Sequence, residues 1–195
     1  GSAGAEVIFG EWNPSGHLPE PFPFHEKDCP ATVLGEFPGG DKVHYGEDIF
    51  VGYRYYDTYD VPVAFPFGYG LSYTDFVMTG IRAEVVEDTA KSTAGKVSFD
   101  ISNIGARAGA AVAQIYVADK YPKVKKAAKE LRAFEKLYLE AGETREVSLM
   151  LEREAFTYYD EEAHCFRADA GSYMLMLAKN AEEIVDITEI ELRSE

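Results

Sequence analysis

Residues 52–57 read GYRYYD and residues 65–76 read FPFGYGLSYTDF, and this stretch divides an irregular part of the chain from a strand-rich part. Between Gly52 and Phe76 lie nine aromatic side chains, two prolines and three glycines. Proline fixes φ and removes a donor, while glycine permits positive φ, so neither a long helix nor a regular central strand fits here. Because so much aromatic surface is rarely left in water, the stretch is predicted to be an ordered, non-repetitive connector between two packed bodies.

After the connector, apolar and polar residues alternate with a period of two, as they do in half-buried strands. Residues 110–118 are apolar at both odd and even positions, which is typical of a strand covered on both faces. In the last strand-like segment, residues 184–192, the apolar residues change from odd positions (Val185, Ile187) to even positions (Ile190, Leu192). A β-bulge between Ile187 and Ile190 would place both pairs on the same face of the strand. The pattern predicts seven short strands, at 76–86, 96–102, 110–118, 134–139, 147–151, 173–177 and 184–192.

Seven short strands separated by turns favour an antiparallel β-sandwich of the fibronectin type III or immunoglobulin kind. A true immunoglobulin domain is disfavoured because the Cys-Trp-Cys pattern is missing, and the single tryptophan, Trp12, lies outside the strand region. The expected fold class is therefore mainly β, with an irregular segment in front of the sandwich.

The sequence before the connector reads as the end of a different structure. Residues 3–9 followed by Gly10 predict the last turns of a helix with a glycine stop. Residues 13–16 read NPSG, a strong turn signal, and three prolines between residues 17 and 23 require an extended chain. Residues 24–48 form a charged, glycine-rich loop, and loops of that length are usually functional or disordered.

The connector carries a resemblance to a known family. Residues 50–57 (FVGYRYYD) and 65–74 (FPFGYGLSYT) resemble the junction between the α/β sandwich domain and the fibronectin type III-like domain of family 3 glycoside hydrolases, the β-glucosidase family. Residues 6–10 and 13–19 resemble the closing helix and exit segment of that α/β sandwich domain, although the family usually has Arg or Lys where His17 stands. Further motifs follow in family order, namely SNIG (102–105), QIYV (114–117), KELRAFEK (129–136) and AGSY (170–173).

The resemblance implies three parts. Residues 1–23 would be the C-terminal end of the α/β sandwich domain, residues 24–74 a loop and the aromatic interdomain connector, and residues 75–195 the fibronectin type III-like β-sandwich. Residues 1–23 are then expected to be poorly anchored when the rest of their domain is missing, or to be held by another chain.

The same resemblance implies a retaining hydrolase of terminal β-linked glucose or a similar sugar. Such enzymes place two carboxyl groups about 5–5.5 Å apart, one as nucleophile and one as acid/base. In the family the nucleophile is an Asp on an N-terminal barrel and the usual acid/base Glu lies upstream of the NPSG turn, and neither motif is present here. We therefore expect no catalytic residue in this chain and no activity of the chain alone. Its expected partners are the barrel and α/β sandwich domains of the same hydrolase and, for the complete enzyme, a carbohydrate substrate.

Tyr53, Arg54, Tyr55 and Tyr56 allow two interpretations. They pack at the domain interface, which is the favoured interpretation, or they border the sugar site, since aromatic faces suit the C–H face of a sugar and Arg donates to hydroxyls. For the whole chain, the alternative hypothesis is a stand-alone carbohydrate-binding or adhesion module with a fibronectin-like fold.

Composition restricts the classes of partner. The net charge of −15 argues against nucleic acid or an anionic membrane surface, and the basic cluster at residues 123–129 is predicted to be a solvated turn among acidic neighbours. No apolar run approaches the roughly 20 residues that span a bilayer, no targeting segment is visible, and the compartment stays open. Cys29, Cys165 and the four histidines lack metal-ligand spacing, so no metal or other cofactor is expected. His164 is predicted to be a packed strand residue.

Overall fold

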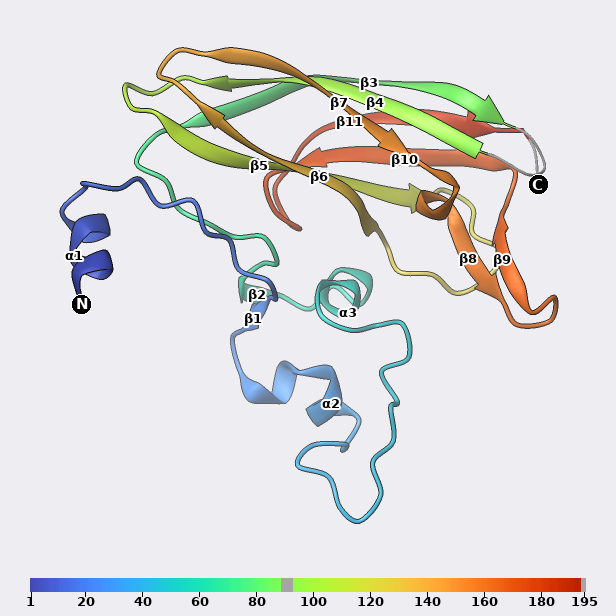
Figure 1. Cartoon of the computed structure of the whole chain (residues 1–195). Coiled ribbons are helices and arrows are strands. Elements are labelled where there is room, and N and C mark those ends of the chain that lie inside the picture. The colour runs from blue at the N-terminus through green and yellow to red at the C-terminus, as the bar shows by residue number, and fades with distance from the viewer. Residues whose placement is uncertain (89–92, 194–195) are drawn as a thin grey trace.

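The computed structural model describes residues 1–88 and 93–193, and its strand-rich part consists of two antiparallel sheets packed face to face (Figure 1). One sheet has three strands in the order β3-β4-β7, and the other has four in the order β11-β10-β5-β6. Their bounds are β3 (Phe76–Asp88), β4 (Thr93–Asn103), β7 (Thr144–Leu151), β5 (Gly109–Asp119), β6 (Glu130–Leu139), β10 (Gly171–Ala178) and β11 (Ile184–Leu192). The seven predicted strands and the mainly β fold class are confirmed.

The core lies between the two sheets and is built from alternate residues of each strand. Val97, Phe99 and Ile101 of β4 are fully buried, and the opposite sheet contributes Ile115 and Leu175, also fully buried. The residues between them on β4 face outward, as the alternation predicts. Each such side chain stabilises the fold by about 1.5–3 kcal/mol relative to an exposed one.

A third layer covers the outer face of the four-stranded sheet. This layer is the connector, with α3 (Tyr53–Thr58) and the short strand β2 (Val63–Phe65) that pairs with β1 (Phe22–Pro23) (Figure 1). A separate apolar cluster fills the space beneath it and includes Tyr116 and Met176 of the sheet with Phe67 of the connector. Strand β5 is therefore covered on both faces, as its continuous apolar sequence predicts.

The predicted bulge in the last strand exists, but its predicted position was wrong. Leu177 pairs with Asp186 and Ala178 with Ile184, so the extra residue is Val185. Consequently Ile187 points outward and is 54% exposed, while Ile190 is buried. The shift turns Asp186 toward the other sheet, where its carboxylate accepts the Ile81 N–H at 3.0 Å, at an irregularity in the β3–β4 pairing.

A hairpin that the sequence analysis missed projects from the connection between β7 and β10 (Figure 1). It consists of β8 (Thr157–Asp160) and β9 (Cys165–Ala168), preceded by the short 3-10 helix η2 (Arg153–Ala155). His164 lies in its turn with φ 51° and is exposed, so the prediction of a packed strand residue was wrong. Where the chain returns to the sandwich, the buried Tyr173 hydroxyl donates to the Asp169 carbonyl at 2.8 Å, the tyrosine corner found in sandwiches of this kind.

Asn103, at the end of β4, ties four segments together. Its side chain is buried and fully hydrogen-bonded, because the amide donates to the carbonyls of Arg107 (2.8 Å) and Leu139 (3.2 Å). The amide oxygen accepts from the Thr74 hydroxyl (2.6 Å) and the Gly105 N–H (3.1 Å). The end of the connector is thereby fixed to the sandwich.

The N-terminal residues are anchored in part. Helix α1 (Ser2–Ile8) ends before Gly10, which has φ 78° as the glycine stop predicts, but the helix buries none of its residues. The exit segment is held more firmly, since Asn13 donates to the Ala108 carbonyl (3.0 Å) and accepts from the Tyr73 N–H (2.7 Å). The expectation of poor anchoring was therefore wrong for the exit segment.

The exit segment and the connector also approach each other closely at Gly70. A Cβ on Gly70 would lie 2.7 Å from the Gly16 carbonyl oxygen and 2.8 Å from the His17 ring, so glycine is required there.

We predict that Asn103→Ala lowers the free energy of unfolding by about 2–3 kcal/mol, because it leaves buried donors and acceptors without partners. Chemical denaturation followed by far-UV circular dichroism measures this. Ser102→Ala is the control, since Ser102 shares only an exposed hydrogen bond with Thr144, and surface changes stay within about 0.5 kcal/mol. Equal effects of the two variants would contradict the anchoring role of Asn103.

We also predict that the pKa of His17 lies below its ordinary value of 6.5, because burial disfavours the charged ring. A hydrogen bond with the Ser15 backbone opposes this effect, and repulsion by Lys136, the smallest of the three, adds to it. As the pH falls, His17 is protonated in the unfolded chain before it is protonated in the folded chain. Its contribution to the free energy of unfolding is therefore complete above pH 6.5 and is lost on acidification. An NMR titration of the His17 ring tests this, and a pKa at or above 6.5 would contradict it.

Candidate functional site

The four residues predicted to border a sugar site, Tyr53, Arg54, Tyr55 and Tyr56, are the first four residues of α3. The helix starts after Gly52, whose φ of 59° suits glycine, and it stops before Asp60, which has φ 53°. A helix this short between two such breaks is not stable alone, so packing must hold α3 in place.

Tyr53 faces the sandwich. Its ring lies against Phe67 and Tyr116, with ring centroids 5.1 and 5.7 Å away. Its hydroxyl oxygen accepts the Leu131 N–H at 2.8 Å, at the start of β6. The side chain is therefore engaged in packing between connector and sandwich.

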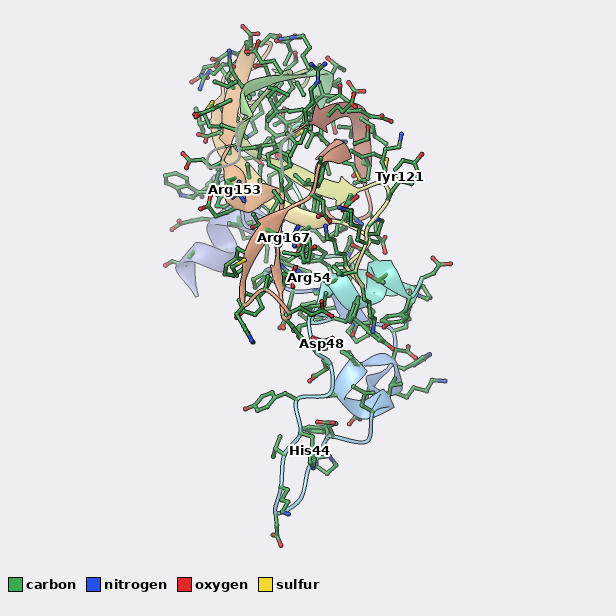
Figure 2. The ribbon with its side chains drawn as sticks, turned by 90° about the vertical axis from the view of Figure 1, so that its right-hand side faces the viewer. His44, Asp48, Arg54, Tyr121, Arg153 and Arg167 are labelled. Carbon is green, nitrogen blue, oxygen red and sulfur yellow. The ribbon has the colours of Figure 1, made fainter. Side chains whose placement is uncertain are left out.

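Arg54 is bound to the sandwich by a carboxylate. Its guanidinium lies 2.8 Å from Glu130, and about a third of its side chain is exposed. The other Glu130 oxygen receives Arg132 at 2.6 Å. Arg54 also lines an open groove of about 960 Å³ between α3 and the β8–β9 hairpin, whose wall includes Tyr159 and Phe166 in edge-to-face contact. Figure 2 labels Arg54 and Asp48, another lining residue.

Tyr55 and Tyr56 do not line this groove. Tyr56 is buried, and its ring contacts that of Tyr55 at 5.2 Å. Burial, and after it the neighbouring Cys29 thiol, raises the pKa of the Tyr56 hydroxyl well above its ordinary value. Tyr55 packs in turn on Tyr59, at 5.3 Å. The structure thus joins Tyr53 and Arg54 to the sandwich and packs the other two among connector residues; their role beside a sugar stays a prediction.

An ion pair that the sequence analysis missed fixes the same helix. Asp57 lies 2.6 Å from Lys129, and both side chains are nearly buried. Burial raises the pKa of the Asp57 carboxyl, although the bond with Lys129 acts in the opposite direction. The pair joins residues 72 positions apart, so no local pattern could have indicated it.

The basic cluster before β6 is a solvated turn only in part, since Lys123 and Lys125 are exposed whereas Lys126 and Lys129 are not. Lys126 is only 13% exposed and lies 2.7 Å from Asp119, which is also nearly buried. Lys125 lies over the Phe50 ring at 4.3 Å. The prediction of acidic neighbours was right, but Lys126 is held by the sandwich out of water, and Lys125 contacts the connector while it stays exposed.

Within residues 1–88 and 93–193, no group of three or more His, Cys, Asp or Glu side chains is placed to hold a metal ion. No helix in these ranges has the length and apolar composition that a membrane crossing requires.

Known proteins are similar to this chain over nearly its whole length. Residues 111–181 match the family model of the fibronectin type III-like domain. Thermostable β-glucosidase B of Acetivibrio thermocellus is 39% identical over 95% of the chain, and an exo-α-(1→6)-L-arabinopyranosidase of Bifidobacterium longum is 37% identical over 98%. These matches cover 24% and 25% of the two relatives, so the chain spans about a quarter of their length.

A solved structure shows the same arrangement. The family 3 β-glucosidase of Bifidobacterium adolescentis superposes with a TM-score of 0.91 at 36% identity, over 98% of this chain and 28% of that one. Because the match covers nearly the whole chain, it includes the exit segment and the connector as well as the sandwich. The chain therefore belongs to the C-terminal, fibronectin type III-like region of the family 3 glycoside hydrolases.

Proposed function

We propose that the chain is the C-terminal segment of a retaining β-glucosidase-type hydrolase, in which it packs against the catalytic domains and contributes no catalytic residue. The observation that carries this proposal is the similarity to a β-glucosidase over nearly the full chain, connector included. A segment that keeps both the sandwich and its attachment to the rest of the enzyme is expected to occupy the same position.

Within this proposal the chain has three parts. Residues 1–23 are the end of the α/β sandwich domain, residues 24–74 the loop and connector, and residues 75–195 the fibronectin type III-like domain. The start of β3 at Phe76 and the helix before Gly10 support these limits. The connector's role is to hold the sandwich in a fixed orientation, and its contacts with the sandwich support this, among them Asp57–Lys129 and Arg54–Glu130.

The substrate of the complete enzyme is a terminal β-linked glucose or a similar sugar. The β-glucosidases among the relatives support this class. The arabinopyranosidase, named for an α-(1→6) linkage, leaves the sugar and the linkage open. Of the four residues proposed to border the sugar site, Arg54 has the strongest support, because it presents a partly exposed guanidinium to a groove.

The first test compares the isolated chain with a chimera, in which this chain replaces the matching 28% of the Bifidobacterium adolescentis β-glucosidase. We predict that the isolated chain releases no sugar from an aryl β-glucoside, because the two carboxyl groups of a retaining site are expected outside it, whereas the chimera hydrolyses it. Measurable turnover by the isolated chain, abolished by one substitution within it, would overturn the proposal. So would a chimera that folds but is inactive.

A second prediction concerns Arg54 in the same chimera. If its guanidinium donates to a sugar hydroxyl, Arg54→Ala should raise KM by roughly threefold to tenfold with little change in kcat, since one hydrogen bond contributes about 0.5–1.5 kcal/mol. Glu130→Gln is the matched control, because it weakens the same ion pair and keeps the guanidinium. Equal KM values for Arg54→Ala and the parent would remove Arg54 from the sugar site.

The alternative, a stand-alone carbohydrate-binding module, draws support from the groove itself, where Tyr159 and Phe166 are exposed beside charged hydrogen-bonding groups. Calorimetric titration of the isolated chain with short β-glucans distinguishes the two functions. Saturable binding, lost on Phe166→Ala, would favour the module.

A further inference from the structure

Residues 24–49 form an arm that extends away from the sandwich and returns to it, and we use the name arm for this segment. The arm contains the 3-10 helix η1 (Glu26–Asp28) and α2 (Pro30–Val33). In Figure 1 it hangs below the connector, and in Figure 2 His44 marks its far part. None of the arm's side chains is buried.

The arm is unusually rich in exposed apolar side chains. It carries seven that are large and exposed, whereas the described part of the sandwich, which is more than four times as long, carries twelve. The density is more than twice that of the sandwich surface, although the arm has no core of its own. The seven residues are Phe24 (59% exposed), Val33 (57%), Leu34 (50%), Phe37 (60%), Val43 (64%), Tyr45 (89%) and Ile49 (39%).

The arm's internal bonds cannot explain this surface. Its hydrogen bonds between backbone groups are local, for example from the N–H groups of Glu36 and Phe37 to the Ala31 carbonyl. At its base, Cys29 lies next to the buried Tyr56. Ordering the backbone costs about 1–2 kcal/mol per residue in entropy, and burial of apolar surface normally offsets that cost. Where exposed apolar side chains gather into a continuous surface, that surface usually marks an interaction site.

We propose that the arm is the surface by which this segment docks onto the catalytic domains of the hydrolase. This inference rests on the proposed function and adds to it the place of contact. The chain spans only about a quarter of its relatives, so the remaining three quarters offer the partner that the arm requires: an apolar surface fixed to the same polypeptide.

A second exposed apolar patch lies on the same side of the molecule and is proposed to join the same contact. Helix α1 carries Ile8 (76% exposed) and is followed by Phe9 (82%) and Trp12 (66%). In Figure 1, α1, the connector and the arm all lie beyond the four-stranded sheet, on the side away from β3, β4 and β7. One partner on that side can cover both patches.

The charge of the arm disfavours a second copy as the occupant. The arm holds six acidic residues and two lysines, and the whole chain carries −15. A two-fold dimer brings the same patch of both subunits together, so its six carboxylates would face those of the other copy, and like charges repel.

The test substitutes Val43→Ser and Tyr45→Ser together, both in the isolated chain and in the β-glucosidase chimera. Both side chains are exposed here, so the unfolding temperature of the isolated chain should stay within about one degree. In the chimera the same change should lower the unfolding temperature by several degrees and reduce activity at high temperature. The control, Val77→Ser with Met150→Ser, removes exposed apolar groups (40% and 50% exposed) from the three-stranded sheet and should affect chain and chimera equally.

The outcomes separate this inference from the proposed function. An active chimera that responds to the arm variant no more than to the control overturns the docking alone. So does a dimer of the isolated chain, seen by analytical ultracentrifugation, that the arm variant dissociates while the chimera is unaffected. A folded chimera that is inactive with the native arm overturns the proposed function and the docking with it.

Discussion

The structure depends on the covering of the four-stranded sheet's outer face. Strand β5 is apolar on both sides, and a sheet whose outer face met water would expose Tyr116 and Met176, which are buried. The connector prevents this by placing Tyr53 and Phe67 on that face. Because the Tyr116 hydroxyl already donates to Gln114 at 2.6 Å, the layer closes without leaving that hydroxyl unpaired. This burial places α3 on the outer face of the four-stranded sheet.

Charged pairs then fix the register of the covering layer. Apolar packing is non-directional, whereas Asp57–Lys129 and Arg54–Glu130 each join one position of α3 to one position of the sandwich. Asp57–Lys129 lies largely out of water, where removing one partner of a pair typically costs about 3–5 kcal/mol. Such a pair adds little net stability but disfavours alternative placements of the helix on the sandwich.

The sequence predicted the features that repeat along the chain and missed those that depend on distant partners. Alternation located the seven strands, and double-sided apolarity identified β5 as covered on both faces. The β8–β9 hairpin was missed because its turn residues, ending in His164, carry no glycine or proline signal, and its aromatic residues Tyr159 and Phe166 face outward. The position of the bulge was predicted wrongly because the alternation of apolar residues shows that one residue is extra but not which one. The ion pair of Asp57 with Lys129 lies beyond any local pattern.

The single tryptophan determines what an optical probe of this molecule can report. Trp12 stands just beyond α1, largely in solvent and outside both sheets. The wavelength of its fluorescence emission is therefore set by the water or protein around α1, with little contribution from the strands. In a larger assembly, a shift of that emission to shorter wavelength would report burial of the amino-terminal end. Unfolding of the strands would change the same emission little.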